Sequence, residues 1–406
     1  MNGKMSYFRL GAHRRGERGN WRFAVFAPRA SAVSVVGDFN GWHVGANPMT
    51  REDDGVWCAE ISDLCEGMLY KFAITSGRGD VVLKADPYAF RSELRPNTAS
   101  VLSDIPRYDW SDGEYFEKRS KRDPFTSPMN IYEVQLQSWN GETDMHKRCE
   151  QLVSYAEDMG YTHIELLPVT EYPLDDSWGY QATGYFSVSA RLGGVDNIMF
   201  LINLAHSKGL EVILDWVPAH FTKDAHGLRQ FDGEPLFESS DPLRAEMPQW
   251  GTLLFDYEKP EVREFLTENA LFLLKELHAD GLRVDAVSCM LYNDFCKQQW
   301  RPNRFGGRDN IDAIEFIKEL NIAVHRECPG CLMIAEESSA YPLVTQPVYA
   351  SGLGFDFKWN MGYMNDTLSY FEEDPLFRKH HHDKLTFPMV YAFSEKYILP
   401  FSHDEV

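Results

Sequence analysis

The sequence predicts an α/β protein with two parts, an N-terminal immunoglobulin-like β-sandwich followed by a TIM-type (β/α)8 barrel. Short β-like runs separated by Gly, Asn, Asp and Pro occupy residues 1–105, which is typical of a sandwich. From residue 129 to 406, strand-like and helix-like patterns alternate, and this indicates a parallel sheet. Acidic residues end the apolar strands, where the active sites of such barrels lie.

Composition restricts the class of partner. The net charge is −21, from 61 acidic and 40 basic residues, which argues against nucleic acid or an anionic membrane and for an uncharged or cationic ligand. Hydrophobic residues at 44% and charged residues at 25% are ordinary for a globular protein. Aromatic residues reach 14% with ten Trp, as in many sugar-binding proteins, although large cores also need them.

Cysteine usage and apolar runs indicate a cytoplasmic protein. Residues 1–10 hold no apolar run of signal-peptide length, and no run of about 18 apolar residues occurs. Seven Cys at irregular spacings do not form a disulfide framework. Cys328 and Cys331 form a C-x-x-C motif at an expected turn between a helix and a strand, where two ordinary thiols are favoured over a redox centre.

In the first part, alternating or apolar runs predict strands, and a turn from Asp38 carries Trp42 out of the sheet. The polar, Pro-containing residues 106–128 predict a linker that drapes over the surface rather than packing. The predicted strands are residues 21–28, 32–37, 55–61 and 68–75.

About seven β/α repeats follow. No Gly-rich phosphate turn comes after the first strand, so a (β/α)8 barrel is favoured over a Rossmann sheet. The predicted strands are residues 131–136, 164–168, 212–217, 281–287, 332–336, 352–357 and 397–401, and the predicted helices are 149–159, 196–206, 260–278 and 311–325.

Arg283 and Asp285 are charged residues at the end of an otherwise apolar strand, and they project to the same side. Such a pair in isolation is more often a buried salt bridge than a catalytic pair. Other acidic residues and histidines also end predicted strands. All of them lie at the same end of the predicted barrel, which favours an active site. These are Asp215, His220, Glu336, His403 and Asp404.

Convergent carboxylates without a Cys or His cluster suit glycosyl transfer, where two carboxyl groups do the bond chemistry. A Mg²⁺ or Ca²⁺ site is the competing interpretation, but a cation would repel Arg283. No nucleotide, flavin or phosphate motif occurs, so we expect no cofactor and no metal.

Four sequence blocks resemble the conserved regions of the α-amylase family, glycoside hydrolase family 13. Further motifs resemble the glycogen branching enzymes of that family, including those that begin at Trp178 and Arg95 and the sandwich motif that ends at Trp42. The blocks are Asp215-Trp-Val-Pro-Ala-His220, Gly281-Leu-Arg-Val-Asp285-Ala, Ile334-Ala-Glu336-Glu-Ser and Phe401-Ser-His-Asp404.

The resemblance implies a 1,4-alpha-glucan branching enzyme of glycogen biosynthesis, a retaining transglycosylase with glycogen or another α-1,4-glucan as donor and acceptor. Asp285 would be the nucleophile, Glu336 the general acid and then base, and Asp404 the stabiliser of the charged sugar. The sandwich would be a glycogen-binding module. The substrate-binding residues would be Tyr180, which stacks under the sugar, Asp215, which orients Arg283, and Arg283, His220 and His403.

Amylases commonly carry Lys-His two residues after the nucleophile, where this chain has Val287 and Ser288, and the difference favours transfer over hydrolysis. Gln135, Gln137 and Tyr341 depart from the branching-enzyme pattern without touching the catalytic acids.

The family's pattern continues beyond Asp404 through an eighth repeat and a further domain, whereas this sequence ends at Val406. We therefore expect a barrel that lacks its last repeat and has little stability or activity. Two alternatives stay open: an α-glucan hydrolase of the same family, debranching or trehalose-releasing, and a non-catalytic glycan-binding fragment.

Overall fold

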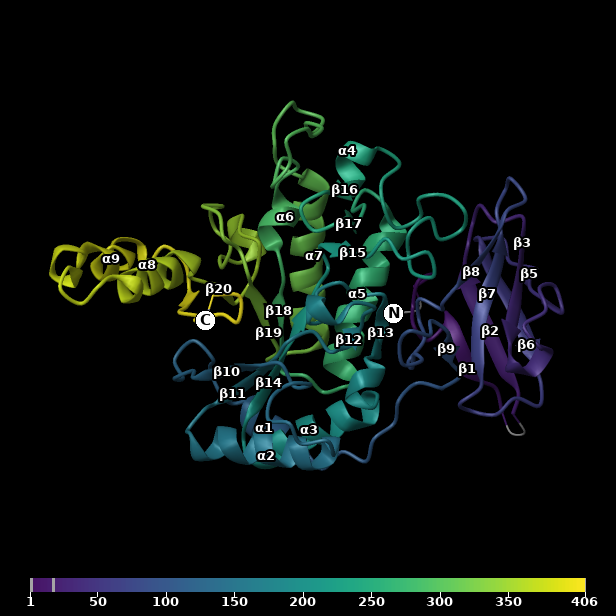
Figure 1. The fold of residues 1–406 in the computed structure, drawn as a ribbon, viewed down its shortest axis with the longest axis horizontal. Coiled ribbons are helices and arrows are strands. Elements are labelled where there is room, and N and C mark those ends of the chain that lie inside the picture. Colours follow the sequence, from purple (N-terminus) through teal and green to yellow (C-terminus); the bar gives the residue numbers. More distant parts are fainter. Residues whose placement is uncertain (1–2, 17–18, 406) are drawn as a thin grey trace.

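Residues up to Val101 form two antiparallel sheets in the computed structural model, which describes residues 3–16 and 19–405 (Figure 1). The strands are β1 (Gly11–Arg14), β2 (Trp21–Phe26), β3 (Ala32–Gly37), β4 (Asn47–Pro48), β5 (Thr50–Arg51), β6 (Val56–Ile61), β7 (Leu69–Thr75), β8 (Val81–Lys84) and β9 (Ser100–Val101). One sheet has the order β1-β2-β6-β5, and the other has the order β4-β3-β7-β8 with β9 beside β7. Phe23 of the first sheet meets Tyr70 of the second, with ring centroids 5.2 Å apart, so aromatic side chains fill the sandwich.

The second part is built on a 7-stranded parallel sheet. Its strands are β10 (Ile131–Val134), β11 (His163–Leu166), β14 (Glu211–Trp216), β18 (Gly281–Val284), β19 (Leu332–Ala335), β20 (Phe357–Trp359) and β21 (Tyr397–Ile398). They lie in the order of the chain, each parallel to the next. No strand of the described residues joins β21 to β10, so the sheet is open there. The prediction of a β-sandwich followed by a parallel β/α sheet is confirmed.

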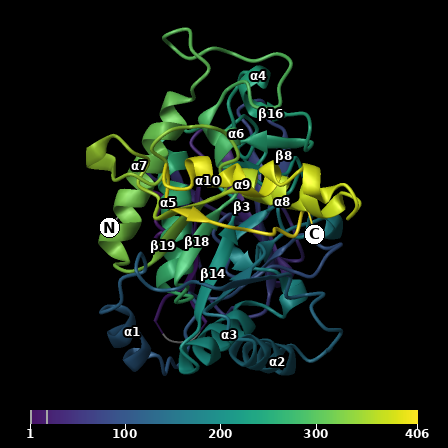
Figure 2. The ribbon, with the colours of Figure 1, turned by 90° about the vertical axis from the view of Figure 1, so that its left-hand side faces the viewer.

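Helices connect these strands, and their first residues follow capping rules. Asp144 accepts hydrogen bonds from the first-turn amides of α2, Pro260 opens α5, and Asn310 caps α7. The helices α1, α2 and α3 lie together at one end of the sheet, and α4 and α6 lie at the other (Figure 2). The helices are α1 (Gly113–Arg119), α2 (Met145–Asp158), α3 (Val195–Ser207), α4 (Pro242–Ala245), α5 (Pro260–Lys275), α6 (Val287–Leu291), α7 (Ile311–Glu327), α8 (Met361–Glu372), α9 (Asp383–Thr386) and α10 (Pro388–Tyr391).

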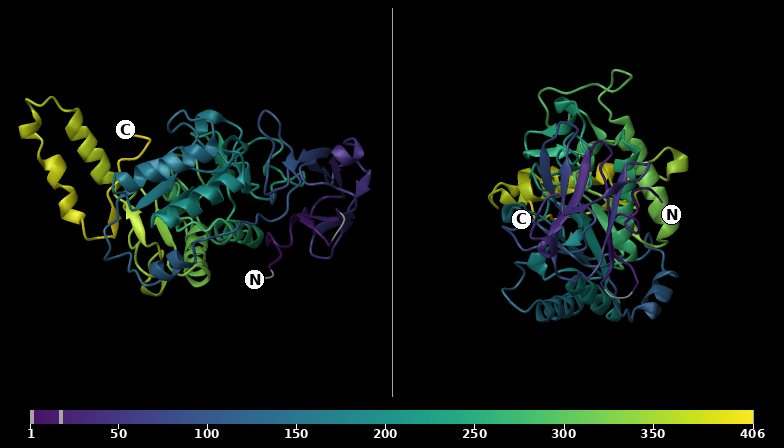
Figure 3. Two further views of the ribbon diagram at one scale, coloured as in Figure 1. Left: turned by 90° about the horizontal axis from the view of Figure 1, so that it is seen from below. Right: turned by 90° about the vertical axis from the view of Figure 1, so that its right-hand side faces the viewer.

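Shorter elements complete the chain. The helices α8, α9 and α10 extend away from the sheet on the side opposite to the sandwich (Figures 1 and 3). The remaining strands are β12 (Thr170–Glu171), β13 (Gly184–Val188), β15 (His220–Phe221), β16 (Glu246–Met247) and β17 (Thr252–Leu254), and the 3-10 turns are η1 (Asp38–Asn40), η2 (Asp175–Ser177), η3 (Ala190–Leu192), η4 (Val348–Ala350) and η5 (Arg378–His380).

The sixth strand of the sheet was predicted at the wrong place. It spans Phe357–Trp359 rather than residues 352–357. Gly352 packs so closely that a Cβ there would lie 1.9 Å from the carbonyl oxygen of Gln346, and Gly354 has a φ of +88°. These two positions require a tight turn, which a strand cannot provide.

The predicted strand 281–287 is also shorter than expected. It ends at Val284, and Ala286 adopts a left-handed conformation with φ 53° before α6 begins at Val287. Asp285 therefore stands in a sharp turn between a strand and a helix, with its backbone held on both sides.

Residues 106–128 do not drape over the surface as predicted. Arg119 and Tyr115 of α1 bind the Asp280 carboxylate at 2.5 and 2.7 Å, and Asp112 lies 2.9 Å from a ring nitrogen of His206. The other ring nitrogen of His206 lies 2.9 Å from Asp280. This segment is attached to the base of the sheet by bonds to the buried residues Asp280 and His206. Its polar residues have partners that are remote in sequence.

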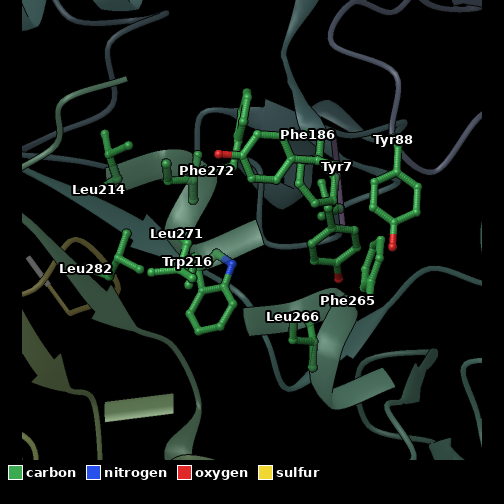
Figure 4. Packing of buried hydrophobic residues seen from close by; sticks show 14 of the residues in the cluster. Tyr7, Tyr88, Phe186, Leu214, Trp216, Phe265, Leu266, Leu271, Phe272 and Leu282 are labelled. Atoms are coloured by element: carbon green, nitrogen blue, oxygen red, sulfur yellow. The ribbon is translucent and has the colours of Figure 1, made fainter. Parts of the chain in front are cut away.

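A continuous apolar core joins the sandwich side to the sheet (Figure 4). The Tyr88 ring stacks on Phe186 at 4.8 Å and meets Phe265 of α5 edge-on at 5.5 Å. Tyr7 lies edge-on to Phe272 at 5.4 Å. The N-terminal part is therefore packed against the β/α part of the chain rather than merely tethered to it.

Candidate active site

Arg283 lies at the centre of the charged groups that end β14 and β18. Asp215 and Arg283 are opposite residues in this parallel strand pair. Nη1 of Arg283 lies 3.0 Å from Oδ1 of Asp215 and 2.7 Å from Oδ1 of Asp285. Arg283 is only 2% exposed, so these contacts form in a poorly solvated environment. One guanidinium therefore serves two carboxylates.

Arg283 is also covered by an aromatic ring, because its guanidinium carbon lies 4.3 Å from the centroid of the Trp359 ring. Burial alone would lower the pKa of Arg283, but Asp215 and the other anionic neighbours raise it above its ordinary value. The guanidinium stays charged and its position is fixed.

Asp285 is partly exposed in the turn after β18. Its N–H donates to the carbonyl of Trp216 at 2.9 Å, and Oδ2 lies 3.9 Å from Nε2 of His220. Burial lowers the pKa of His220, which favours the neutral imidazole. Among the described residues, Nδ1 of His220 has no hydrogen-bond partner, so this ring keeps polar capacity beside Asp285.

Glu336 follows β19 and is bonded to the same turn. Its Oε2 accepts a hydrogen bond from the N–H of Ala286 at 2.8 Å, and its own N–H donates to Val284 at 3.0 Å. Burial raises the pKa of Glu336, although Arg283 acts in the opposite direction. The Glu336 carboxyl group is thus bonded to the residue that follows Asp285. Its raised pKa favours the protonated form.

Tyr180 connects Asp215 to the last part of the chain. Its hydroxyl donates to Oδ2 of Asp215, and its ring is stacked on His403 at 5.3 Å with an interplanar angle of 9°. Burial raises the pKa of Asp215 to about 7, although Arg283 lowers it. One face of the Tyr180 ring, which was predicted to stack under a sugar, is therefore covered by His403.

His403 and Asp404 follow β21. Nδ1 of His403 lies 2.6 Å from Glu133 of β10, its backbone N–H donates to the same carboxylate at 3.0 Å, and Nε2 lies 3.2 Å from Asp404. Burial lowers the pKa of His403, but the hydrogen bonds with Asp404 and Glu133 outweigh this and raise it to about 10. The bond to His403 lowers the pKa of Asp404, whose side chain is 71% exposed. The predicted residues thus form one network, and Asp404 is its most exposed carboxylate.

A cleft borders this network. Its volume is about 530 Å³, and it lies between the ends of β19 and β20 and the region of α10. Trp359, which covers Arg283, contributes to the lining together with Tyr341, Tyr391 and Tyr397. Aromatic walls beside carboxylates are suited to an uncharged polyhydroxyl ligand.

Two acidic residues of the site escaped the sequence analysis. Glu133 binds His403, and Glu165 of β11 is 1% exposed with a pKa raised by burial and by Glu133. Glu165 interrupts an apolar run as Arg283 does, so the same signal could have found it.

A buried ion pair beside Glu336 was also missed. Lys358 lies 2.5 Å from Glu337, and Ser288 donates to the same carboxylate at 2.6 Å. The pair connects β20, the turn after β19 and α6. Lys358 stands in a strand that was predicted elsewhere, which is why no pattern indicated it.

Within residues 3–16 and 19–405, no group of three or more His, Cys, Asp or Glu side chains could hold a metal ion. In the same part of the chain no helix has the length and apolar character needed to cross a membrane.

Comparisons with known proteins match both parts of the chain. The family "Carbohydrate-binding module 48 (Isoamylase N-terminal domain)" matches residues 9–89, and the family "Alpha amylase, catalytic domain" matches residues 138–236 and 249–392. A crystal structure of a putative alpha amylase from Salmonella typhimurium is similar in fold, with a TM-score of 0.70 and 21% identity over 94% of this chain and 59% of that one.

Curated relatives are more similar in sequence. A 1,4-alpha-glucan branching enzyme GlgB of Hydrogenovibrio crunogenus is 52% identical over 95% of this chain and 54% of the relative. The protein of the same name from Myxococcus xanthus is 51% identical over 98% of this chain and 56% of the relative, and that of Oceanobacillus iheyensis is 49% identical over 98% and 64%. This chain thus spans about half the length of the first two relatives.

Proposed function

Because this chain belongs to the α-amylase family, whose catalytic-domain description matches residues 138–236 and 249–392, we propose that it acts on α-1,4-glucans as a branching enzyme. It would cleave an α-1,4 linkage and transfer the released segment to the 6-hydroxyl of another glucose unit. The observation that carries this proposal is the turn after β18, where Arg283 binds Asp285 and the next N–H binds Glu336. The names of the curated relatives support the same activity.

In the first step, Asp285 attacks the anomeric carbon and forms a covalent glycosyl ester with the enzyme, while Glu336 protonates the departing glycosidic oxygen. Arg283 at 2.7 Å keeps Asp285 ionised and fixes its orientation. Burial raises the pKa of Glu336, which suits a group that must hold a proton until the bond breaks.

In the second step, Glu336 removes the proton of the incoming hydroxyl, whose oxygen attacks the anomeric carbon and releases Asp285. Two displacements at one carbon retain the anomeric configuration. Asp404 would stabilise the positive charge that develops on the sugar in each step.

Three further residues would hold the sugar. His220, whose Nε2 lies 3.9 Å from Oδ2 of the proposed nucleophile Asp285, would bind a sugar hydroxyl. His403 would bind a hydroxyl of the same glucose, and Tyr180 would present its ring to that glucose. Asp215 would act through Arg283, which it contacts at 3.0 Å.

Transfer rather than hydrolysis is supported by the residues after the nucleophile. Val287 and Ser288 stand where amylases carry Lys-His, and both are buried, with Ser288 bonded to Glu337 at 2.6 Å. The aromatic cleft of about 530 Å³, whose lining includes Glu337, the residue after Glu336, would give a glucan acceptor a place.

The architecture and setting enter the same proposal. The sheet would be that of a (β/α)8 barrel without its eighth strand, which fits parallel strands in chain order that stay open between β21 and β10 in the described residues. The sandwich, which matches a carbohydrate-binding module, would bind glycogen. A cytoplasmic location is supported by the seven cysteines, which are all free thiols.

The test is incubation of the chain with amylose, followed by iodine staining and by analysis of 1,6 linkages. Because we expect this chain to have little activity, we expect the iodine colour to fall only slowly as 1,6 linkages appear, and we expect Asp285→Asn to abolish both changes while leaving glycogen binding intact. Asp158→Asn, an exposed change in α2, is the matched control. Release of reducing ends without 1,6 linkages would favour a hydrolase, glycogen binding without turnover would favour a binding fragment, and transfer by Asp285→Asn would refute the nucleophile.

A further inference from the structure

Cys328 and Cys331 face each other across the turn that joins α7 to β19. Cys328 is the residue after α7, its carbonyl accepts the N–H of Cys331 at 3.1 Å, and Gly330 between them has a φ of +86°. The Cys331 thiol hydrogen-bonds to the sulfur of Cys328, and both are free thiols. The turn, closed by the bond from the N–H of Cys331 to the carbonyl of Cys328, thus holds two reduced cysteines at its first and last positions.

Fixed neighbours orient the inner sulfur. Nη2 of Arg119 lies 3.7 Å from the sulfur of Cys331, whose thiol also lies 3.6 Å from the carbonyl of Ala279. Arg119 is itself bound to the buried carboxylate of Asp280 at 2.5 Å. The sulfur of Cys331 is therefore held in place by the contacts that attach α1 to the base of the sheet.

The two thiols differ in acidity and access. The hydrogen bond from Cys331 lowers the pKa of Cys328, and the same bond raises the pKa of Cys331. Cys328 is 8% exposed and Cys331 is 4% exposed, but Pro329 of the same turn is exposed. Cys328 is thus the more acidic and slightly more exposed of the two thiols, and it is followed by the exposed Pro329.

We propose that Cys328 and Cys331 form a reversible thiol–disulfide couple that closes by exchange with a low-molecular-weight disulfide. The thiolate of Cys328 attacks one sulfur of that disulfide, and the other sulfur leaves as a thiol after it takes up a proton. The thiolate of Cys331 then attacks Cys328 and expels the second thiol. The protein loses two protons and two electrons, and the disulfide becomes two thiols.

The couple is independent of the proposed glucan chemistry. Cys331 stands directly before β19, whose other end delivers Glu336, so the sheet separates the two. Because the folded turn already holds the sulfurs together, closure should be more favourable in the folded chain than in the unfolded chain, and by linkage the bond should stabilise the fold.

The experiment equilibrates the folded chain in buffers of reduced and oxidised glutathione, quenches it in acid and digests it with trypsin. The tryptic peptide of residues 327–358 contains both cysteines and no other, so the internal bond appears as a loss of two hydrogens. We expect closure with an equilibrium constant about tenfold or more above that of the chain unfolded in urea.

Single variants complete the test. Cys328→Ser and Cys331→Ser should each abolish the internal bond, and Cys331→Ser should accumulate a glutathione adduct on Cys328. Cys65→Ser and Cys296→Ser, at exposed cysteines, should leave closure unchanged. The proposal is overturned if the peptide stays reduced in folded protein whose Cys65 has reacted, or if the folded equilibrium constant is no larger than the unfolded one.

Discussion

At the scale of single residues, Arg283 decides whether the site can hold its charges. Two carboxylates at 3.0 and 2.7 Å would repel each other strongly in a buried environment without it. Nη1 of the guanidinium binds both carboxylates, and the guanidinium carbon lies 4.3 Å from the centroid of the Trp359 ring. A lysine ammonium is a point charge without that shape.

We therefore expect Arg283→Lys to lower the rate of glucan transfer by about 100-fold, a typical effect of removing one preorganised electrostatic contact. The measurement is the initial rate of 1,6-linkage formation at saturating amylose. Arg304→Lys, at a side chain 57% exposed, is the matched control and should retain the wild-type rate. Equal rates of transfer in the two variants would show that the guanidinium group of Arg283 is not required.

His403 gives a prediction about pH. Its pKa is raised to about 10 in the folded chain from an ordinary value of about 6.5, so its protonation stabilises the fold. This stabilisation is complete below about pH 6.5 and is lost as pH rises through 10. The difference in free energy of unfolding between the wild type and His403→Gln should shrink over that range, as measured by urea titrations at several pH values. A difference that is constant or grows with pH would contradict the assignment.

The residues of the site were predictable to the extent that they broke a local pattern. Arg283 and Asp285 stood out as charges that end an apolar strand. Tyr180 came only from the resemblance of the motif that begins at Trp178. The other predicted residues stood out at the ends of other strands, and these are Asp215, His220, Glu336, His403 and Asp404. Glu165 carried the same signal and was overlooked. Lys358 and Glu133 could not be recognised, because their importance comes from partners 21 and 270 residues away in sequence.

At the scale of elements, α1 shows how a polar surface helix can be attached to a buried charge of the sheet. Asp280 is fully buried and accepts hydrogen bonds from Tyr115, Arg119 and the N–H of Val212. Burial raises the pKa of Asp280, but His206 and the other donors outweigh this and keep it below its ordinary value. Composition alone predicted a draped linker, because the attachment of a short polar helix to a buried charge is recognised only when its distant partners are known.

We expect Asp280→Asn to lower the free energy of unfolding by about 3–5 kcal/mol, the usual cost of leaving buried cationic partners without their anion. Chemical denaturation followed by tryptophan fluorescence measures this. Asp109→Asn, an exposed change on the same segment, should fall within about 0.5 kcal/mol of the wild type. Equal values for the two variants would mean that the bonds to Asp280 contribute no stability.

At the scale of the whole molecule, the sandwich is attached to the β/α part of the chain by charged residues as well as by the aromatic core. Arg29 donates to the fully buried carboxylate of Asp232 at 2.9 Å. Lys84 of β8 donates to three backbone carbonyls of the loop after β15, those of Ala225, Gly227 and Arg229. The order of the elements and the two-part architecture were predictable, but this docking was not, because it depends on single residues in loops.

Replacement of Arg29 by Ala should leave Asp232 buried without its cation and lower the free energy of unfolding by about 1–3 kcal/mol. It should also increase protease cleavage in the loop after β15. The control is Arg78→Ala, because the Arg78–Glu234 pair is 3.8 Å long with side chains 80% and 47% exposed and should contribute little. Chemical denaturation and limited proteolysis measure the two effects. Equal free energies of unfolding and equal cleavage in the two variants would contradict the prediction.

The bond between His403 and Glu133 has a further consequence. It spans the opening between the last and first strands of the sheet, at 2.6 Å for the ring and 3.0 Å for the backbone N–H. No backbone ladder supports it among the described residues, so the last turn behaves as an intramolecular ligand whose local concentration is set by β21. Under the proposed function, only the molecules in which this turn is docked would present Asp404 to a sugar, and the apparent affinity for a glucan would be scaled by that fraction.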